Sequence, residues 1–442
     1  MKQRIAADFP RVRRELSDLV RIPGCAFPGF PDDQIERACA YVIDLYRAAG
    51  FPRVERLDIE GGKPAVLAEV SGPPGSPTVL LYAHYDVQPA GDLALWHSPP
   101  FEPTERDGRL YGRGAADDKS GVVVHAAVLR AFDGHPPCTL RVVVEGDEEW
   151  GGPFAEYPRH NPGLFAADAI VVADVGNARL GEPTLTTALR GMAAVTVECR
   201  TLTGAVHSGM FGGPAPDALM ALIGLLATLR DERGETAVDG IAGFDWDGPG
   251  PDEATFRELA GVVEDQPLTG TGSIASRLFS KPVVNVVGID APPTQGAVNA
   301  VVPFARARVS LRVPPGHDAP AAREALMEHL RTHAPWGVKV TVTPDVVGQG
   351  VRVDTSGPAY AAARRALQEA YGAPAQEIGA GGSIPLIDSL RTAVPQAEIL
   401  LFGAQDPMAR IHAPNESVDL GELERTVLAE ALFVEYFGAG EN

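Results

Sequence analysis

Three short apolar segments, each leading into ionisable residues, constrain the fold of this 442-residue chain more than any other feature. They are residues 78–83, 139–144 and 169–173. Apolar runs of about five or six residues rich in Val, Leu and Ile are typical of strands buried on both faces, as in a parallel sheet. Residues 120–132 are apolar almost all round, which predicts a buried crossover helix between the first two strands. The sequence therefore predicts an α/β domain with a mostly parallel central sheet.

The pattern changes in the middle of the chain. Residues 192–200 and 304–313 alternate apolar and polar side chains, which is typical of half-exposed antiparallel strands. Helices are expected at 217–230 and in the first part of 321–343, while 231–281 is rich in Gly, Asp and Pro and carries no recognisable chemistry. We therefore expect an α+β domain at 188–349, inserted into an α/β domain formed by residues 1–187 and 350–442.

The charge balance excludes several classes of partner. The chain has 58 acidic and 38 basic residues, a formal net charge of −20. A nucleic acid or an anionic membrane would require a basic surface. Residues 1–21 are charged and lack a signal-peptide core, and the four cysteines are widely spaced without a CxxC pair. We therefore expect a cytoplasmic protein with no nucleic-acid or membrane partner.

Histidines and carboxylates follow the predicted strands. Taken singly, such residues are helix caps, solvated turns or surface side chains. Together they meet at one sheet edge, because ligand sites of α/β sheets lie at the carboxyl ends of the strands. Carboxylates gathered there repel one another unless cations lie among them. Two histidines with three or four carboxylates match a dinuclear zinc or manganese site. The residues concerned are His84, Asp86, Asp117, Asp118, Glu148, Glu149, Asp174 and His412.

The local spacing separates ligands from supporting residues. In the sequence His84-Tyr85-Asp86, residues i and i+2 lie on the same side of an extended chain, so Asp86 can orient the His84 ring through its second nitrogen. Of Glu148 and Glu149, one can bind metal while the other stays free. A free carboxylate beside metal-bound water is a ready general base.

Motifs along nearly the whole chain resemble one family of enzymes. They are AHYDVQP (83–89), WHSPPFEP (96–103), LYGRGAADDKSG (110–121), EGDEEWGG (145–152), VHSGMFGG (206–213), GAGGSIPLI (379–387) and RIHAPNESV (410–418). The sequence is similar to the co-catalytic metallopeptidases that include carnosinase, cytosolic nonspecific dipeptidase, aminoacylase, succinyl-diaminopimelate desuccinylase and glutamate carboxypeptidase. Within this family it most resembles the dipeptidase branch. The inserted domain would then be a lid and dimerisation domain.

The resemblance implies a set of metal ligands. His84, Asp117 and Asp174 would hold one metal ion, and Asp117, Glu149 and His412 the other, with Asp117 bridging. Glu148 would be the general base, Asp86 would orient His84, and the peptide bond after Asp117 would be cis. Two divalent ions per subunit are implied, with zinc as the expected metal and manganese or cobalt as alternatives.

The resemblance also implies substrate contacts. His207, from the lid domain of a partner subunit, would stabilise the tetrahedral oxyanion. Arg312 would bind the substrate carboxylate, and Gly382 and Ser383 would contact the same end. Asn299 is a further candidate, although it lies one residue earlier than the asparagine of many members. Family members often have an aliphatic residue followed by Gly-Ser where residues 150–152 read Trp-Gly-Gly.

These residues predict a soluble dinuclear metallohydrolase that cleaves the amide bond of dipeptides or similar small peptides. A metal-bridging water activated by Glu148 would attack the bond, and the enzyme would be a homodimer. The alternative enzyme is an N-acyl amino acid deacylase of the aminoacylase or desuccinylase type. Asp174 favours peptides with a free amine, because aspartate there accompanies aminopeptidase-like members. An alternative of another class is a catalytically silent dimeric binding protein.

Overall fold

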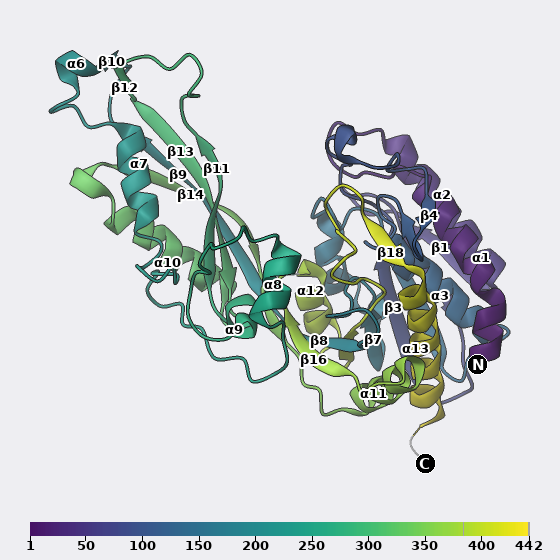
Figure 1. Ribbon diagram of the computed structural model, residues 1–442. Helices are drawn as coiled ribbons and strands as arrows, with labels where there is room; N and C mark the ends of the chain where they lie inside the picture. The colour runs from purple at the N-terminus through teal and green to yellow at the C-terminus, as the bar shows by residue number, and fades with distance from the viewer. Residues whose placement is uncertain (383, 441–442) are drawn as a thin grey trace. The chain divides into compact units, whose positions relative to one another are not determined.

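The computed structural model describes residues 1–382 and 384–440. Two compact units are present (Figure 1). The first consists of residues 1–187, 353–378 and the C-terminal part from 385, and the second of residues 188–352 and 379–384. The chain enters the second unit within strand β8 (Thr184–Leu189), leaves it at the end of strand β15 (Val351–Arg352) and returns to it for residues 379–384, which begin within strand β16 (Gln376–Ala380). Residues 379–384, which the sequence analysis placed in the catalytic domain, thus cluster with the second unit.

The first unit is built on a six-stranded sheet with the order β1-β2-β6-β3-β7-β17. The four strands β6, β3, β7 and β17 are parallel, while β2 and β1 continue the sheet in antiparallel fashion. Its central strands are almost entirely buried, as their apolar sequences predict. The strands are β1 (Arg53–Leu57), β2 (Ala65–Val70), β3 (Thr78–His84), β6 (Thr139–Glu145), β7 (Ala169–Val172) and β17 (Glu398–Leu401). A three-stranded sheet adds β4 (Thr104–Arg106), β5 (Arg109–Tyr111) and β18 (Ser417–Asp419).

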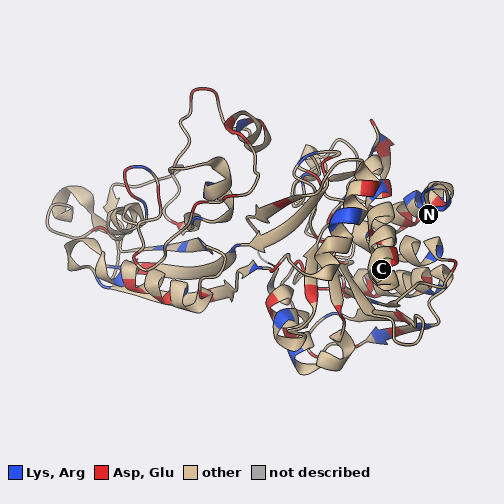
Figure 2. Ribbon diagram, turned by 90° about the horizontal axis from the view of Figure 1, so that it is seen from below, with Lys and Arg blue, Asp and Glu red and all other residues tan. Residues whose placement is uncertain are grey.

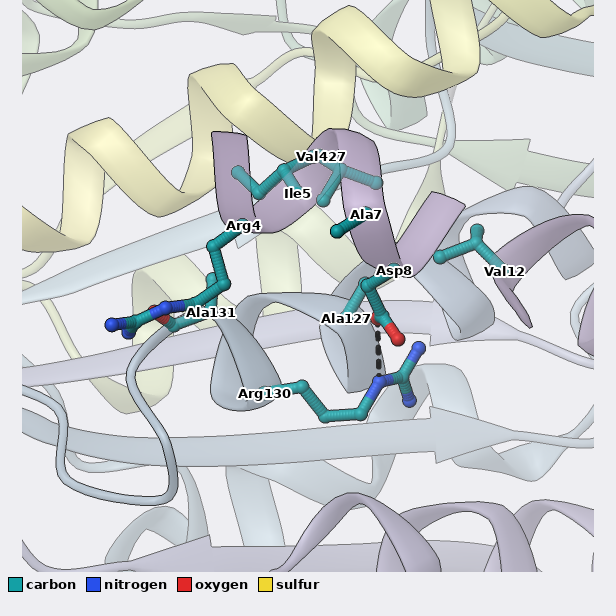
Figure 3. Close-up of a pocket in the computed structure, with 9 residues that line it drawn as sticks. All are labelled: Arg4, Ile5, Ala7, Asp8, Val12, Ala127, Arg130, Ala131 and Val427. Atoms are coloured by element: carbon teal, nitrogen blue, oxygen red, sulfur yellow. Dashed lines mark hydrogen bonds and ion pairs between the residues drawn. The ribbon is translucent and has the colours of Figure 1, made fainter. Parts of the chain in front are cut away.

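Long helices cover this sheet. Helix α3 is the predicted crossover and is buried on nearly all sides. Helix α1 packs against α3 and α13, and an ion pair of 2.7 Å joins Asp8 of α1 to Arg130 of α3 (Figure 3). The helices are α1 (Lys2–Val20), α2 (Asp32–Ala49), α3 (Lys119–Ala131), α4 (Tyr157–His160), α5 (Pro162–Phe165), α11 (Pro358–Tyr371), α12 (Pro385–Ala393) and α13 (Leu420–Ala439).

The second unit has its own core. An antiparallel sheet with the order β11-β13-β9-β14 packs against helices α7 and α10 (Figure 1). The segment 231–281 carries two short helices, α8 and α9. The elements are β9 (Gly191–Arg200), β10 (Val206–His207), α6 (Ser208–Phe211), α7 (Ala218–Ala227), α8 (Glu253–Ala260), α9 (Ile274–Phe279), β11 (Val283–Asp290), β12 (Ala300–Val301), β13 (Phe304–Val313), α10 (Ala319–Thr332), β14 (Val340–Gly348) and β15 (Val351–Arg352).

The architecture confirms the expected fold class, an α/β domain with a mostly parallel sheet interrupted by an α+β domain. Acidic residues occur along both units (Figure 2). Among the described residues, no helix combines the length and apolar character needed to cross a membrane.

Candidate metal centre

The carboxyl ends of three neighbouring parallel strands carry the first group of candidate ligands. His84 is the last residue of β3, fully buried, and lies in register with Glu145 at the end of β6. Glu148 and Glu149 follow β6 by three and four residues, and Asp174 follows β7 by two. Because β6, β3 and β7 are adjacent and parallel, these side chains meet at one edge of the sheet.

Asp117 joins the two histidines. Its Oδ1 lies 3.1 Å from Nε2 of His84, and its Oδ2 lies 3.0 Å from Nε2 of His412. The same His412 nitrogen is 3.1 Å from Oε2 of Glu149, and Nε2 of His84 is 3.9 Å from Oδ2 of Asp174. Each carboxylate oxygen of Asp117 thus faces a different imidazole, the arrangement expected of a carboxylate between two cations. The Asp117–Asp118 peptide bond is cis.

Two overlapping groups of side chains have ligand atoms within 4.8 Å of one another: His84 with Glu148 and Asp174, and His84 with Asp117 and Glu149. Imidazole nitrogens and carboxylate oxygens are the ligands that zinc and manganese bind in proteins. The residues brought together therefore fit divalent metal ions. Glu148 lies within the first group, so a free carboxylate would stand directly beside a metal held by its neighbours.

The electrostatics of the cluster show an excess of negative charge. Burial raises the pKa of Glu148 to about 8, opposed by His84 and reinforced by Glu149. Burial and the Asp117 carboxylate raise the pKa of Asp174 well above its usual range. Burial also acts against ionised Asp117, but hydrogen bonds from His412 and His84 hold its pKa well below the usual range. The carboxylates compete for too little positive charge, which divalent cations would supply.

Asp86 organises the turn that carries the two glutamates. Its carboxylate accepts hydrogen bonds from the backbone N–H of Glu148 and Glu149 at 3.2 and 3.1 Å. Its Oδ1 also lies 3.3 Å from Nδ1 of His84, opposite the nitrogen that faces Asp117. Asp86 therefore has the position from which a carboxylate can orient a metal-binding imidazole.

The loop that carries His412 has an unusual backbone. Arg410, His412 and Asn415 all have positive φ, with a φ of 61° at His412. This conformation is costly for residues with a Cβ atom and is often found at functional sites. The Asn415 side chain fixes the loop, since it accepts a hydrogen bond from His97 N at 2.7 Å and donates one to Leu95 O at 2.9 Å.

Glu416 is a supporting residue that the sequence analysis missed. Its buried carboxylate accepts hydrogen bonds from the backbone N–H of Gly114, Ala116 and Asp117 at 3.0 to 3.1 Å. It also pairs with Arg113 at 2.6 Å. Glu416 thereby fixes the backbone from which Asp117 projects. The available signal was its place in the motif RIHAPNESV, four residues after His412.

Two glutamines were missed as well. Gln88 donates to Oε2 of Glu149 at 2.8 Å, and Gln405 donates to Oδ1 of Asp174 at 3.0 Å. Gln88 also donates its backbone N–H to Oε1 of Glu149 at 3.2 Å, so it orients the whole carboxylate, whereas Gln405 bonds only Oδ1 of Asp174. The available signal for Gln88 was its place in the motif AHYDVQP, whereas Gln405 lies in none of the quoted motifs.

Comparisons with known proteins identify the family. The model of the peptidase family M20/M25/M40 matches residues 80–436. The chain belongs to this family. It is 43% identical over 438 residues to a cysteinylglycine-S-conjugate dipeptidase of Corynebacterium striatum, covering 97% of this chain and 96% of the relative. It is 28% identical to the human β-Ala-His dipeptidase, over 96% and 86% of the two chains.

A solved structure shows the same fold. The crystal structure of human carnosine dipeptidase 1 superposes with a TM-score of 0.84 and 26% identity, covering 98% of each chain. The predicted resemblance to metallopeptidases of the dipeptidase branch is therefore confirmed, and this M20 member is an enzyme of that class.

The predicted substrate contacts of this M20 peptidase belong to the second unit. His207 is exposed in β10, and its Nδ1 accepts a hydrogen bond from Gly209 N at 3.1 Å. That bond places the proton of a neutral imidazole on Nε2, which leaves an N–H free to donate. Asn299 is exposed, and its carbonyl accepts from Ser208 N at 3.0 Å.

Arg312 and Gly382 also lie in the second unit, whereas Ser383 lies outside the described residues. Arg312 is half-buried on β13, and burial lowers its pKa. Within residues 1–382 and 384–440, no hydrogen bond or ion pair occupies its guanidinium group. It is therefore available for an anion. The roles of His207, Arg312, Gly382 and Asn299 stay predictions.

Proposed function

We propose that this protein is a metal-dependent dipeptidase that holds two divalent ions between His84, Asp117, Glu149, Asp174 and His412. The observation that supports this proposal best is the position of Asp117, whose two oxygens face the two imidazoles at 3.1 and 3.0 Å. When bound, the ions would supply Lewis acidity and lower the pKa of a water molecule. We propose zinc as the metal, with manganese or cobalt as alternatives.

Glu148 performs the proton transfers in this proposal. Its carboxylate accepts a proton from the attacking water and returns it to the leaving nitrogen. Its position beside His84 and Asp174 favours this role, because a free carboxylate next to a metal-bound water is a ready general base. Asp86 holds the turn of Glu148 and the ring of His84 in place.

The second unit provides the substrate contacts. Arg312 binds the C-terminal carboxylate of the dipeptide, and the backbone of Gly382 contacts the same end, together with Ser383. Asn299 is a further candidate for substrate binding. His207 donates its Nε2 proton to the oxyanion from a partner subunit of a homodimer. The unoccupied guanidinium of Arg312 and the hydrogen bond at Nδ1 of His207 support these assignments.

The four cysteines, Cys25, Cys39, Cys138 and Cys199, are all free and buried. Free thiols persist in a reducing compartment. We therefore place the enzyme in the cytoplasm as part of the proposal.

A substrate comparison tests the function. The first substrate to assay is an S-conjugate of cysteinylglycine, since a relative at 43% identity is named for that activity. Alanylalanine, its C-terminal amide and N-acetylalanine complete the set, each with and without added Zn²⁺ or Mn²⁺. We expect metal-dependent hydrolysis of the two dipeptides, weak hydrolysis of the amide and none of the N-acetyl compound. Preferred cleavage of N-acetylalanine would identify a deacylase, and no hydrolysis of any compound would identify a binding protein.

Subunit mixing tests the trans role of His207. Glu148→Ala and His207→Ala homodimers should each be nearly inactive. After joint dissociation and reassembly, about half of the dimers are mixed, and each mixed dimer contains one intact site, so about a quarter of wild-type sites return. Each variant taken through the same cycle alone is the control. No recovery despite proven subunit exchange would contradict the shared site.

A further inference from the structure

The second unit contains a cavity of about 460 Å³ that the dipeptidase function does not use. It lies within the segment 231–281 and the strand ends beside it, all in one unit. Ligand pockets in proteins occupy about 300–1,000 Å³, so this volume suits a small molecule. Its apolar lining comes from Phe256, Val262, Leu268, Ile274, Leu278 and Val283.

The charged lining is mostly positive, although the whole chain carries −20. The cations are Arg190, Arg230, Arg277 and Lys281, and the acid is Glu235. Glu235 is already paired, since it lies 3.1 Å from Nζ of Lys281 and accepts from Thr271 Oγ1 at 2.7 Å. The cavity therefore has a surplus of positive charge.

Arg230 and Arg277 are held by backbone carbonyls. Arg230 donates to Val284 O at 2.6 Å and Gly234 O at 2.9 Å, and Arg277 donates to Gly272 O at 2.8 Å. These bonds orient both guanidinium groups but leave their charges without a carboxylate partner in the part of the chain that the structure describes. They are fixed cations on the cavity wall.

Arg190 is the decisive residue. Only 7% of its surface is exposed, and its Nε has no hydrogen-bond partner. Its one side-chain hydrogen bond among the described residues is a long contact of 3.5 Å from Nη1 to Arg277 O. The guanidinium also passes against Gly381, where a Cβ atom would lie 2.8 Å from Nη2. A buried charge without a counterion is costly, so a positively charged group in this state indicates an anion that comes from outside the chain.

We propose that this cavity is a second ligand site, which binds a small carboxylate with an apolar body. The carboxylate pairs with Arg190, where a guanidinium can offer two parallel N–H groups. The apolar body packs against Phe256, Val262 and Leu278. The proposal uses none of the residues assigned to metal or substrate. Burial and the nearby charge of Arg312 lower the pKa of Arg190, so the two arginines are neighbours and the test has to separate them.

Binding of two probe acids tests the proposal. Isothermal titration of the full-length, metal-loaded enzyme would compare 3-phenylpropanoate and octanoate with their neutral amides. We expect saturable binding of at least one acid, and at least tenfold weaker binding of its amide, since a lost hydrogen bond to a charged group has about that effect. Absence of saturable binding for both acids, or equal affinity for acid and amide, would overturn the site.

Variants locate the bound probe. Arg190→Met should weaken acid binding at least tenfold, and Val262→Trp, which fills the cavity, should abolish it. Arg308→Met is the matched control, because this exposed arginine pairs with Asp345 on the sheet surface and should leave binding unchanged. If Val262→Trp fails to fold by circular dichroism, Phe256→Ala replaces it and should weaken binding through lost contacts.

The arginine of the substrate site provides a competing location. Binding that is lost in Arg312→Met and kept in Val262→Trp would place the probe at the substrate carboxylate position and refute the cavity site. Binding that is kept in Arg312→Met and lost in Val262→Trp is the expected result.

Discussion

The metal centre of the first unit and the Arg190 cavity of the second unit are both unbalanced in charge, but with opposite signs. At the metal centre, four carboxylates (Asp117, Glu148, Glu149 and Asp174) lie around two imidazoles, and burial together with neighbouring carboxylates raises the pKa values of Glu148 and Asp174. In the cavity, the surplus charge is positive and is carried by guanidinium groups. Buried charges of one sign are costly, so such a surplus indicates a site where a ligand of the opposite charge binds.

A comparison of two buried arginines shows that unpaired positive charge is confined to particular sites. Arg113 in the first unit is 1% exposed and pairs with Glu416 at 2.6 Å, while Arg190 is 7% exposed and has no acidic partner among the described residues. Burial of an arginine is thus no signal by itself in this protein. The pairing partner separates a structural arginine from one that awaits an anion.

Removal of the divalent cations should have the largest effect and abolish catalysis. We expect prolonged chelation to abolish hydrolysis and Zn²⁺ or Mn²⁺ to restore it. Asp117→Ala should be the most damaging single ligand variant, because both of its oxygens face imidazoles. Steady-state kinetics and metal content measure both effects, with Asp345→Ala as the surface control. Full activity of metal-free protein would refute the dinuclear site.

The next largest effect concerns Glu148. Glu148→Gln should lower kcat by roughly 10²–10⁴-fold, the usual contribution of a general base. Metal content should stay unchanged, because a neutral amide replaces a carboxylate that is assigned to no metal. Steady-state kinetics and metal analysis by plasma mass spectrometry measure these two effects. Loss of one metal would instead exchange the roles of Glu148 and Glu149.

Glu416→Gln should weaken metal binding about 10–100-fold, as is typical when a residue that supports a ligand is removed. The amide cannot neutralise Arg113, and breaking a buried ion pair typically costs about 3–5 kcal/mol of stability. Glu422→Gln is the matched control, because Glu422 is also fully buried but its hydrogen bonds, from Gly181 N and Asn177, involve no candidate metal ligand. If both variants lose metal affinity equally, Glu416 acts through general stability alone.

The smallest effect concerns the buried ion pair between His125 and Glu430, neither of which is a candidate metal ligand. Nδ1 of His125 lies 2.8 Å from Oε1 of Glu430, and its Nε2 lies 3.1 Å from Tyr82 O, so both nitrogens carry protons. Burial opposes the charged ring, but Glu430 outweighs it and raises the pKa of His125, with the Tyr82 carbonyl and Asp118 adding to this.

Because the folded pKa is raised, the pair stabilises fully below the unfolded pKa of about 6.5, and this stability is lost as pH rises through the folded pKa. We expect the difference in unfolding free energy between wild type and His125→Gln to shrink from pH 6 towards pH 9. The total decrease should be about 1.4 kcal/mol for each unit by which folding raises the pKa of His125. Urea unfolding at several pH values measures it. A difference that is independent of pH would show that the ring stays neutral.

Local patterns predicted much of the fold. The apolar runs at residues 78–83, 139–144 and 169–173 correspond to β3, β6 and β7, since a strand buried on both faces needs a continuous apolar sequence. Helix α13 was not predicted. Its apolar surface is interrupted by the buried acids Glu422 and Glu430, whose partners Asn177 and His125 lie hundreds of residues earlier.

The candidate ligands were predicted for a similar reason, because strand ends and family motifs are local features. Gln88, Gln405 and Glu416 were not predicted, because their supporting role depends on hydrogen bonds that form only in the folded chain. Cavities have no local signature either, and Arg190 looks ordinary until its burial and missing partner are known.

The hydrogen bonds between Glu416 and the backbone of residues 114–117 have a consequence for co-translational folding. His412 and Glu416 are translated about three hundred residues after Asp117. A nascent chain therefore presents His84, Glu149 and Asp174 long before Asp117 is held in place and before the second imidazole exists. The full set of proposed ligands for two metal ions is therefore available only when synthesis is almost finished.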